Sequence, residues 1–172
     1  NFLTAMIVGI IFKINPTEYG SHNPGTANMG AVFGKMGILT CLGDLLKSLI
    51  ALFIVYFVFP GHINIAYAGL GLILDTVFQS GIHFKGGKGV AVSAQVAVFY
   101  DWRAGLATLL IALVLTAIMK FDIPPLVFML LFSVYEFLQN QEAGIVFMVI
   151  TLIMIYKSGK ISLISLPDTE RE

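Results

Sequence analysis

Charged side chains are scarce in this sequence. Only 12% of its 172 residues are Asp, Glu, Lys or Arg, whereas soluble proteins average roughly 25%. Basic and acidic residues balance at ten each, so no excess of positive charge indicates a nucleic-acid partner. The single cysteine, Cys41, lies in an apolar run, which excludes a disulfide framework and a cysteine-based metal site.

Apolar residues are correspondingly frequent in the sequence. They make up 58% of the chain, and the mean hydropathy is +0.90, which is typical of an integral membrane protein. The first apolar run is short, which indicates that the sequence begins inside a helix. The pattern predicts an all-α, polytopic membrane protein with about seven transmembrane helices, near 2–13, 36–60, 65–82, 89–100, 104–119, 124–138 and 143–156.

The basic residues predict how these spans are oriented. Eight of the ten Lys and Arg residues fall on one side, in the loops after spans one, three and five and in the tail: Lys13, Lys35, Lys85, Lys88, Lys120, Lys157, Lys160 and Arg171. An excess of Lys and Arg marks the cytoplasmic face. We therefore expect a cell-membrane protein with its N-terminus outside and its C-terminus in the cytoplasm. Residues 1–166 would form one transmembrane domain, and 167–172 a disordered tail.

A polar loop rich in glycine and asparagine follows the first apolar span, from Tyr19 to Gly30. Its backbone can turn several N–H groups toward one point, and Asn and Ser side chains can complete a nest for an anion. His22 would lie in this nest and could touch the anion. The alternative interpretation is an ordinary connector rich in turns.

A second glycine-rich loop, residues 83–89, lies on the same side of the predicted membrane. Two lysines flank a glycine pair that allows close approach of the backbone to a ligand. The next helix would direct its N-terminal N–H groups at the same place, as in phosphate sites. In the alternative interpretation these lysines only snorkel at the cytoplasmic face. The four residues concerned are Lys85, Gly86, Gly87 and Lys88.

Two charged residues fall inside the second predicted span. Asp44 and Lys47 are three residues apart and share one face of a helix. Charges at membrane depth are costly and are normally paired or directed into a polar cavity. The sequence favours an ion pair between them slightly over direct contact with a ligand. Asp75, in the third span, has no evident local partner and can brace the second polar loop.

These motifs resemble those of the bacterial acyl-phosphate:glycerol-3-phosphate acyltransferase family (the PlsY family). Residues 20–28 resemble its Gly-Ser-Gly-Asn-x-Gly-Ala-Thr-Asn motif. Asp44 and Lys47 match its Asp-x-x-Lys. Residues 84–91 are similar to its Phe-Lys-Gly-Gly-Lys-Gly-Val-Ala loop, the most specific of the three. The resemblance extends over nearly the whole chain.

The resemblance implies a membrane enzyme of phospholipid synthesis. It would transfer a fatty acyl group from acyl phosphate to the 1-hydroxyl of glycerol 3-phosphate, with membrane lipids around it and with neither a metal nor another cofactor. Positioning and charge stabilisation would supply the catalysis. The implied catalytic residues are Ser21, Asn23, Lys85 and Lys88, and the implied substrate-binding residues are Gly20, Gly25, Asn28, Asp44, Lys47, Gly86 and Gly87.

The chain also departs from the family's motifs. Two arginines of the family correspond to about Thr17 and Ala31, and a Gly and a Thr are replaced by His22 and Ala27. The family's C-terminal His and Asn fall around 156–160, where neither residue occurs. Three alternatives therefore stay open. One is an acyltransferase with a different acceptor or donor, and another is a non-catalytic subunit of a membrane assembly with a protein partner. The third is a small transporter or lipid flippase, which the few charges within the spans disfavour.

Overall fold

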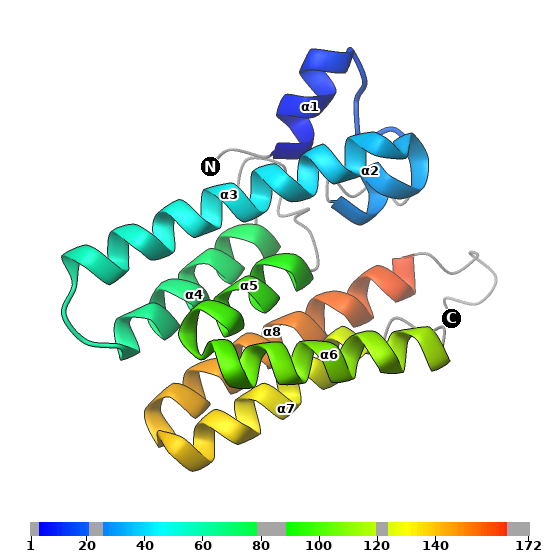
Figure 1. Ribbon diagram of the computed structural model, residues 1–172. Coiled ribbons are helices and arrows are strands. Elements are labelled where there is room, and N and C mark those ends of the chain that lie inside the picture. Colours follow the sequence, from blue (N-terminus) through cyan, green and yellow to red (C-terminus); the bar gives the residue numbers. More distant parts are fainter. Residues whose placement is uncertain (1–3, 21–25, 79–88, 120–123, 165–172) are drawn as a thin grey trace.

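The computed structural model of the chain describes residues 4–20, 26–78, 89–119 and 124–164 (Figure 1). These ranges contain helices and short connections but no strand, so the prediction of an all-α fold is confirmed. In chain order the helices are α1 (Thr4–Phe12), α2 (Thr26–Phe33), α3 (Lys35–Val58), α4 (Ile63–Val77), α5 (Val90–Tyr100), α6 (Trp102–Met119), α7 (Pro124–Gln139) and α8 (Gln141–Ile164).

Most of the predicted apolar segments become helices at nearly the predicted places. α3 and α5 agree within two residues with the predicted spans 36–60 and 89–100. α8 continues to Ile164, whereas the sequence predicts an end at 156, because the polar residues from 157 onward lower the hydropathy without breaking the helix. By length and composition, Lys35–Val58 and Gln141–Ser158 are able to cross a membrane. The full set of seven spans stays a prediction.

The first polar loop is shorter than predicted. The sequence predicts one connection over residues 19–30, but α2 begins at Thr26. Within α2, Met29 is completely buried and joins Ala5 and Val8 of α1 in a small apolar cluster. The prediction was wrong because the glycines and asparagines of this stretch masked a short helical face that packs on α1.

Two glycines let α2 fold back closely onto α3. Gly34, with φ of 57°, makes the turn between the two helices. A Cβ on Gly37 would collide with the backbone of Gly30, so the two helices approach closely enough for main chain to meet main chain. Glycine is the residue type that permits both features. α2 is thereby held against the start of α3.

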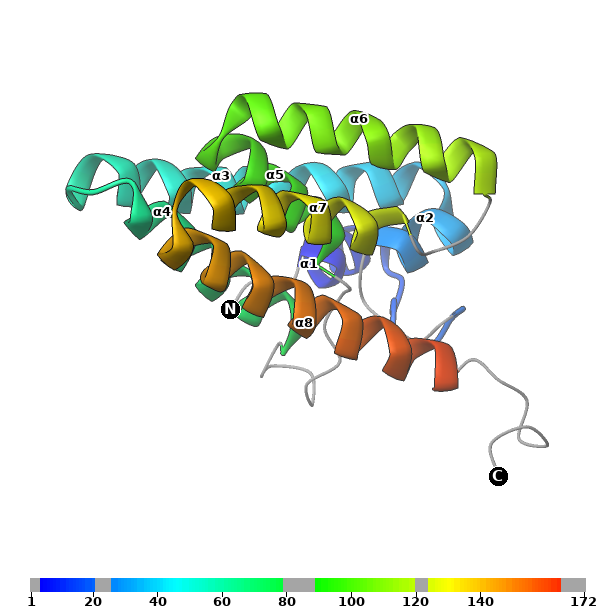
Figure 2. The ribbon, with the colours of Figure 1, turned by 90° about the horizontal axis from the view of Figure 1, so that it is seen from below.

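The larger part of the bundle packs around α4 and α5. α4 lies against α3, α5 and α8, and α5 lies against α3, α4 and α6. α7 packs between α6 and α8, as Figure 2 shows. α1 and α2 both rest on α3, away from the α6–α8 layer (Figure 1). α3 is therefore the element that joins the N-terminal helices to the rest of the molecule.

The core holds apolar side chains from α3 to α8. Phe132 and Phe147 meet edge to face with ring centroids 4.8 Å apart, and Tyr100 lies 5.1 Å from Phe147. Leu52, Val96 and other fully buried residues complete the cluster. This packing brings α5, α7 and α8 together at one end of the bundle.

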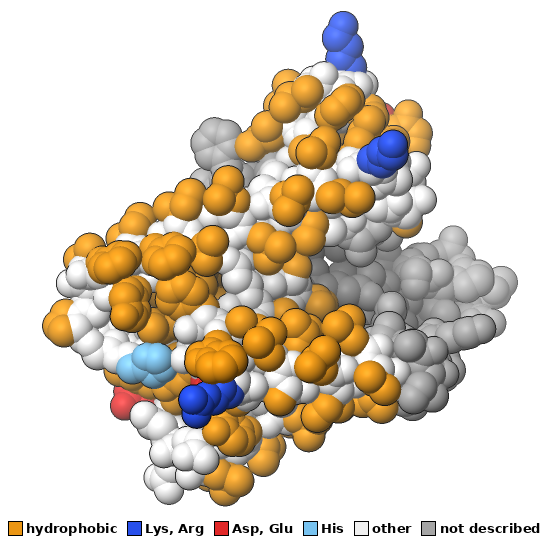
Figure 3. Space-filling model, in the orientation of Figure 1, with side chains coloured by type: hydrophobic (Ala, Val, Ile, Leu, Met, Phe, Trp, Pro, Cys, Tyr) orange, Lys and Arg blue, Asp and Glu red, His pale blue; other side chains and the backbone are white. Residues whose placement is uncertain are grey.

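The outer faces of the helices are also apolar. In α3 the exposed side chains include Ile38, Leu46 and Phe57, with exposed fractions of 61%, 59% and 77%. Figure 3 shows apolar side chains over most of one face of the molecule, with few charged groups. Soluble monomers rarely expose contiguous apolar patches of this extent. Such a surface is typical of helices that face lipid.

Candidate functional site

The structure describes four of the residues predicted for the site: Gly20, Asn28, Asp44 and Lys47. They belong to the connection before α2, to α2 itself and to α3. The other predicted site residues lie outside the described ranges: Ser21, Asn23, Gly25, Lys85, Gly86, Gly87 and Lys88. His22 also lies outside them.

Asn28 fastens the connection between α1 and α2. Its side chain is 5% exposed, and Nδ2 donates to the carbonyl oxygens of Pro16 at 3.0 Å and Tyr19 at 3.1 Å. An amide nitrogen carries two N–H donors, so the backbone of the connection takes both. Gly20 has φ of 62°, and a Cβ there would collide with Asn28 Oδ1. Asn28 thus orders the start of the first glycine-rich segment.

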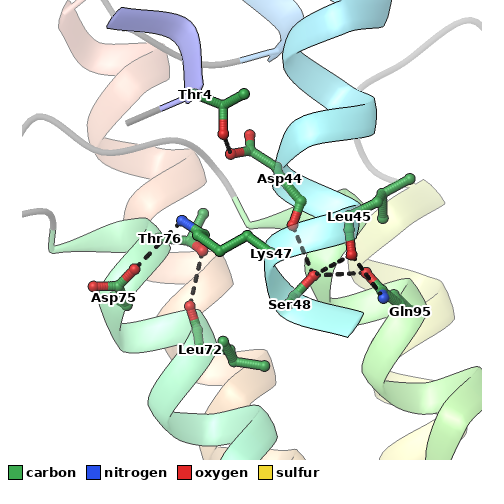
Figure 4. A network of polar contacts seen from close by, with 9 residues as sticks. All are labelled: Thr4, Asp44, Leu45, Lys47, Ser48, Leu72, Asp75, Thr76 and Gln95. Carbon is green, nitrogen blue, oxygen red and sulfur yellow. Dashed lines mark hydrogen bonds and ion pairs between the residues drawn. The ribbon is translucent and has the colours of Figure 1, made fainter. Parts of the chain in front are cut away.

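Asp44 connects α3 to α1. Its Oδ1 accepts a hydrogen bond of 2.6 Å from Oγ1 of Thr4 (Figure 4). The helices are close at this point, because a Cβ on Gly43 would collide with the Thr4 side chain. A charge-assisted bond of this kind is stronger than one between neutral groups. The contact fixes α1 across α3.

Lys47 connects α3 to α4. Its Nζ lies 3.5 Å from Oδ2 of Asp75, and the two side chains are 30% and 35% exposed. The predicted ion pair between Asp44 and Lys47 is therefore wrong for the described residues. Residues three apart on a helix point in directions that differ by about 60°, and here one reaches α1 and the other α4. Asp75, for which the sequence offers no local partner, is the residue that pairs with Lys47.

A third contact connects α3 to α5. Ser48 is completely buried, and its Oγ donates to Oε1 of Gln95 at 2.7 Å. Gln95 Nε2 in turn donates to the carbonyl oxygen of Leu45 at 3.0 Å. Sequence reasoning missed both residues. The signal was present, since Gln95 is the one amide in the otherwise apolar or hydroxyl-bearing helix Val90–Tyr100.

The three contacts define a polar junction, made by Thr4, Asp44, Lys47, Ser48, Asp75 and Gln95 (Figure 4). It extends from a little more than one turn of α3 to three other helices. Asp75 lies in the last turn of α4, three residues before Phe78, so the ion pair lies where the described part of α4 ends. Among the described residues, no group of three or more His, Cys, Asp or Glu side chains is placed to hold a metal ion.

The whole fold is similar to two crystal structures of an integral membrane protein. Both are of PlsY (YgiH), a glycerol 3-phosphate acyltransferase, one in the glycerol 3-phosphate form and one in the lysophosphatidic acid form. Each gives a TM-score of 0.76 at 24% sequence identity, over 99% of this chain and 88% of that chain. At this level of identity the comparison establishes the fold.

Sequence relatives establish the family. The chain is 88% identical over 160 residues to glycerol-3-phosphate acyltransferase 1 of Lactobacillus acidophilus, covering 91% of this chain and 78% of the relative. It is 56% identical over 165 residues to the protein of the same name from Lactobacillus johnsonii, covering 93% and 80%. The family model described as glycerol-3-phosphate acyltransferase matches residues 1–162. This chain belongs to the glycerol-3-phosphate acyltransferase family, as the motif resemblance predicts.

Proposed function

We propose that this protein is a membrane acyltransferase that transfers a fatty acyl group from acyl phosphate to glycerol 3-phosphate. The observation that carries the proposal is the 88% identity, over 91% of the chain, to a glycerol-3-phosphate acyltransferase. In the reaction the 1-hydroxyl oxygen of glycerol 3-phosphate forms a bond to the acyl carbon, and the bond from that carbon to the phosphate oxygen breaks. The hydroxyl proton leaves with the phosphate, so that lysophosphatidic acid and inorganic phosphate are the products.

The protein would carry out this reaction in the cell membrane. The apolar outer faces of α3 and α8 support a membrane location. α3 has 24 residues, so it is roughly 36 Å long and exceeds the hydrocarbon thickness of about 30 Å. The distribution of Lys and Arg supports a cytoplasmic position for both glycine-rich segments and for the C-terminus, with the N-terminus outside.

The chain's own residues would act by positioning and by charge. Lys85 and Lys88 would neutralise substrate phosphate, while the backbone at Gly86 and Gly87 approaches it closely. Ser21 and Asn23, with the backbone at Gly20 and Gly25, would hold phosphate or hydroxyl groups. These assignments come from the family motifs.

The described residues would support that site by holding the helices next to it in place. Asn28 holds the backbone before and at the start of the first glycine-rich segment by hydrogen bonds to the carbonyl oxygens of Pro16 and Tyr19. Lys47 is held by Asp75 near the end of α4, and this ion pair fixes α3 against α4. Asp44 holds α1 in place through Thr4. Groups that are fixed before the substrate arrives lose little entropy on binding and stabilise developing charge most effectively.

A direct assay tests the proposal. Purified protein in phospholipid nanodiscs, given acyl phosphate and glycerol 3-phosphate, should form lysophosphatidic acid, measured by mass spectrometry, with release of inorganic phosphate in equal amount. Product only with another phosphorylated acceptor would favour the alternative of a different acceptor. No product from any acyl phosphate, together with co-purification of a stoichiometric membrane protein, would favour the non-catalytic subunit.

A further inference from the structure

Two charged side chains are buried among the residues that the structure describes. They are Glu136 of α7 and Lys157 of α8, with exposed fractions of 3% and 8%. Removal of a charge from water is costly unless a partner compensates it. Lys157 has such a partner, because its Nζ donates a hydrogen bond of 3.2 Å to the carbonyl oxygen of Val77 at the end of α4. Glu136 differs from Lys157 in this respect.

Oε1 of Glu136 is a buried oxygen without a hydrogen-bond partner in the described part of the chain. The carboxyl group forms no ion pair with the described residues either. Buried polar groups are nearly always bonded, and each exception requires an explanation. Residue 136 falls within the sixth predicted span, where ionisable side chains are rare and usually functional. Glu136 is therefore a candidate site that the proposed acyltransferase reaction does not use.

The groups around Glu136 come from the helices that pack on α7. Asp101, between α5 and α6, acts on Glu136 electrostatically. Tyr100, the last residue of α5, is 7% exposed and lies within electrostatic range of Glu136, Asp101 and Glu142. Figure 1 shows the α5–α6 turn and the α7–α8 turn at the same end of the bundle. Three carboxyl groups from three turns of helix thus gather around one buried ring.

The titratable groups of α4 and α8 at this end leave Glu136 uncompensated. Glu142, at the start of α8, is exposed, and its Oε1 accepts a hydrogen bond of 2.8 Å from the hydroxyl of Tyr67 in α4. The His62 ring, just before α4, lies against Tyr100 with ring centroids 4.3 Å apart. Each of these contacts engages a neighbour of Glu136 and not its Oε1.

Arg103 is the one basic residue in the turns at this end. Its guanidinium lies 5.4 Å from the centre of the Trp102 ring, and the side chain is exposed. One positive charge on the surface thus stands against the three acidic groups, one of which is buried. This excess of negative charge at a buried position favours a bound cation.

We propose that Glu136 binds a small monovalent cation, H⁺ or Na⁺, at the predicted outer end of the bundle. A small ion is required because the side chain is only 3% exposed. A divalent metal fits poorly, since the described residues place no group of three or more His, Cys, Asp or Glu side chains to hold one. The cation would neutralise the buried carboxylate and so stabilise the packing of α7 on α5 and α8. Its binding does not depend on the proposed acyltransferase function.

The first test measures thermal unfolding in nanodiscs by circular dichroism. It compares the unmodified protein with Glu136→Gln, which keeps the shape of the side chain and removes its charge. At mildly alkaline pH, NaCl replaces choline chloride at constant ionic strength. An ion that binds only the folded protein stabilises it in proportion to the logarithm of its concentration above the Kd, so each tenfold increase should raise the melting temperature of the unmodified protein by roughly 3–5 °C. Glu136→Gln should not respond.

The same comparison at falling pH tests the proton. If H⁺ occupies the site, the melting temperature of the unmodified protein should increase relative to that of Glu136→Gln by a similar amount for each pH unit over which Glu136 titrates, because each unit is a tenfold change in proton concentration. Glu142→Gln is the matched control. It removes an exposed carboxylate from the same end and keeps an oxygen to accept from Tyr67, and it should respond to both ions as the unmodified protein does.

Infrared spectroscopy identifies the ion. The measurement uses a maltoside detergent, which has no carbonyl group of its own. The difference spectrum between the unmodified protein and Glu136→Gln should show the C=O band of a protonated carboxylic acid if H⁺ is bound. With Na⁺ it should show a carboxylate band, together with a melting temperature that depends on NaCl.

Equal responses of the unmodified protein and Glu136→Gln to NaCl and to pH, together with a carboxylate band, would overturn the inference. A buried water molecule would then satisfy Oε1. If Glu136→Gln does not fold, the unmodified protein decides by itself. It should show stabilisation by NaCl over choline chloride, or an acid band at mildly alkaline pH, where exposed carboxyl groups are ionised. The absence of both would likewise overturn the inference.

Discussion

The two ends of α5 are held by different kinds of contact. Along its first half, the polar junction and Lys157 make contacts between residues that are 28 to 80 positions apart in the sequence. Beyond its end, Asp101 Oδ1 accepts from the backbone N–H groups of Arg103 and Ala104 at 2.9 and 3.1 Å. In the same way, Asn140 Oδ1 accepts from the N–H of Glu142 at 3.0 Å. These are local caps of α6 and α8.

The difference separates residues that cap helices locally from residues that we propose support the site. A cap satisfies the orphan N–H groups of its own helix and stabilises the fold by about 1 kcal/mol. A charged contact between distant helices costs more to bury and is retained where its charge or its geometry is used. Substitutions at the first end of α5 should therefore change activity, and those at the second end should change stability alone.

The largest effect is expected in the second glycine-rich segment. The double substitution Lys85→Gln with Lys88→Gln should lower kcat/KM for lysophosphatidic acid formation by roughly 100-fold or more, because each lysine would make a charge-assisted bond worth about 1.5–3 kcal/mol. Mass spectrometry of the product measures the change. Lys13→Gln, which removes a charge from an exposed residue after α1, is the control. Equal rates in the double variant and the unmodified protein would show that both lysines only snorkel at the cytoplasmic face and do not bind substrate.

The next effect is expected at the polar junction. Lys47→Met leaves the carboxylate of Asp75 without its ion pair, so unfolding in detergent should be easier by about 1–2 kcal/mol, a value reduced from that of a buried pair because both groups are partly exposed. Activity should fall as well. The double variant Lys47→Met with Asp75→Leu should regain the stability and stay impaired in activity. Recovery of activity along with stability would show that the pair has a structural role only.

The packing of α2 on α3 provides a test of the first glycine-rich segment. Gly37→Ala should destabilise the protein by roughly 1–3 kcal/mol, since overpacking of this size is typically costly, and it should displace α2 with Asn28. Gly71→Ala is the matched control, because nothing lies within 4 Å of a Cβ at that helical position. Thermal unfolding monitored by circular dichroism measures both variants. Equal melting temperatures would contradict the close approach of α2 and α3.

The smallest effect is expected at the second end of α5. Asp101→Ala removes the cap of α6 and should lower stability by about 1 kcal/mol. Both KM values and kcat should stay within about twofold of the unmodified protein, because a change of that size corresponds to less than 0.5 kcal/mol. A loss of activity comparable to that of Lys47→Met would contradict the proposed difference between the two ends of α5.

Sequence reasoning predicted the helices well and the contacts between them poorly. The spans over α3 and α5 were predicted within two residues because hydropathy is a local property. The Asp44–Lys47 pair was predicted wrongly, although both residues were singled out, because spacing along one helix says nothing about the helices beside it. Ser48 and Gln95 were overlooked for the same reason, since each is unremarkable until α3 lies against α5.

The sequence by itself determined the all-α class, the approximate helix boundaries and the family, through its apolar runs and its Phe-Lys-Gly-Gly-Lys-Gly motif. Only the tertiary structure decided that Lys47 pairs with Asp75, that Asn28 fastens the backbone before α2, and that Lys157 caps α4. The physical reason is the distance along the sequence over which each effect acts. Hydropathy and helix propensity act over a few residues, whereas the partner of a charge buried between helices depends on which surfaces pack together.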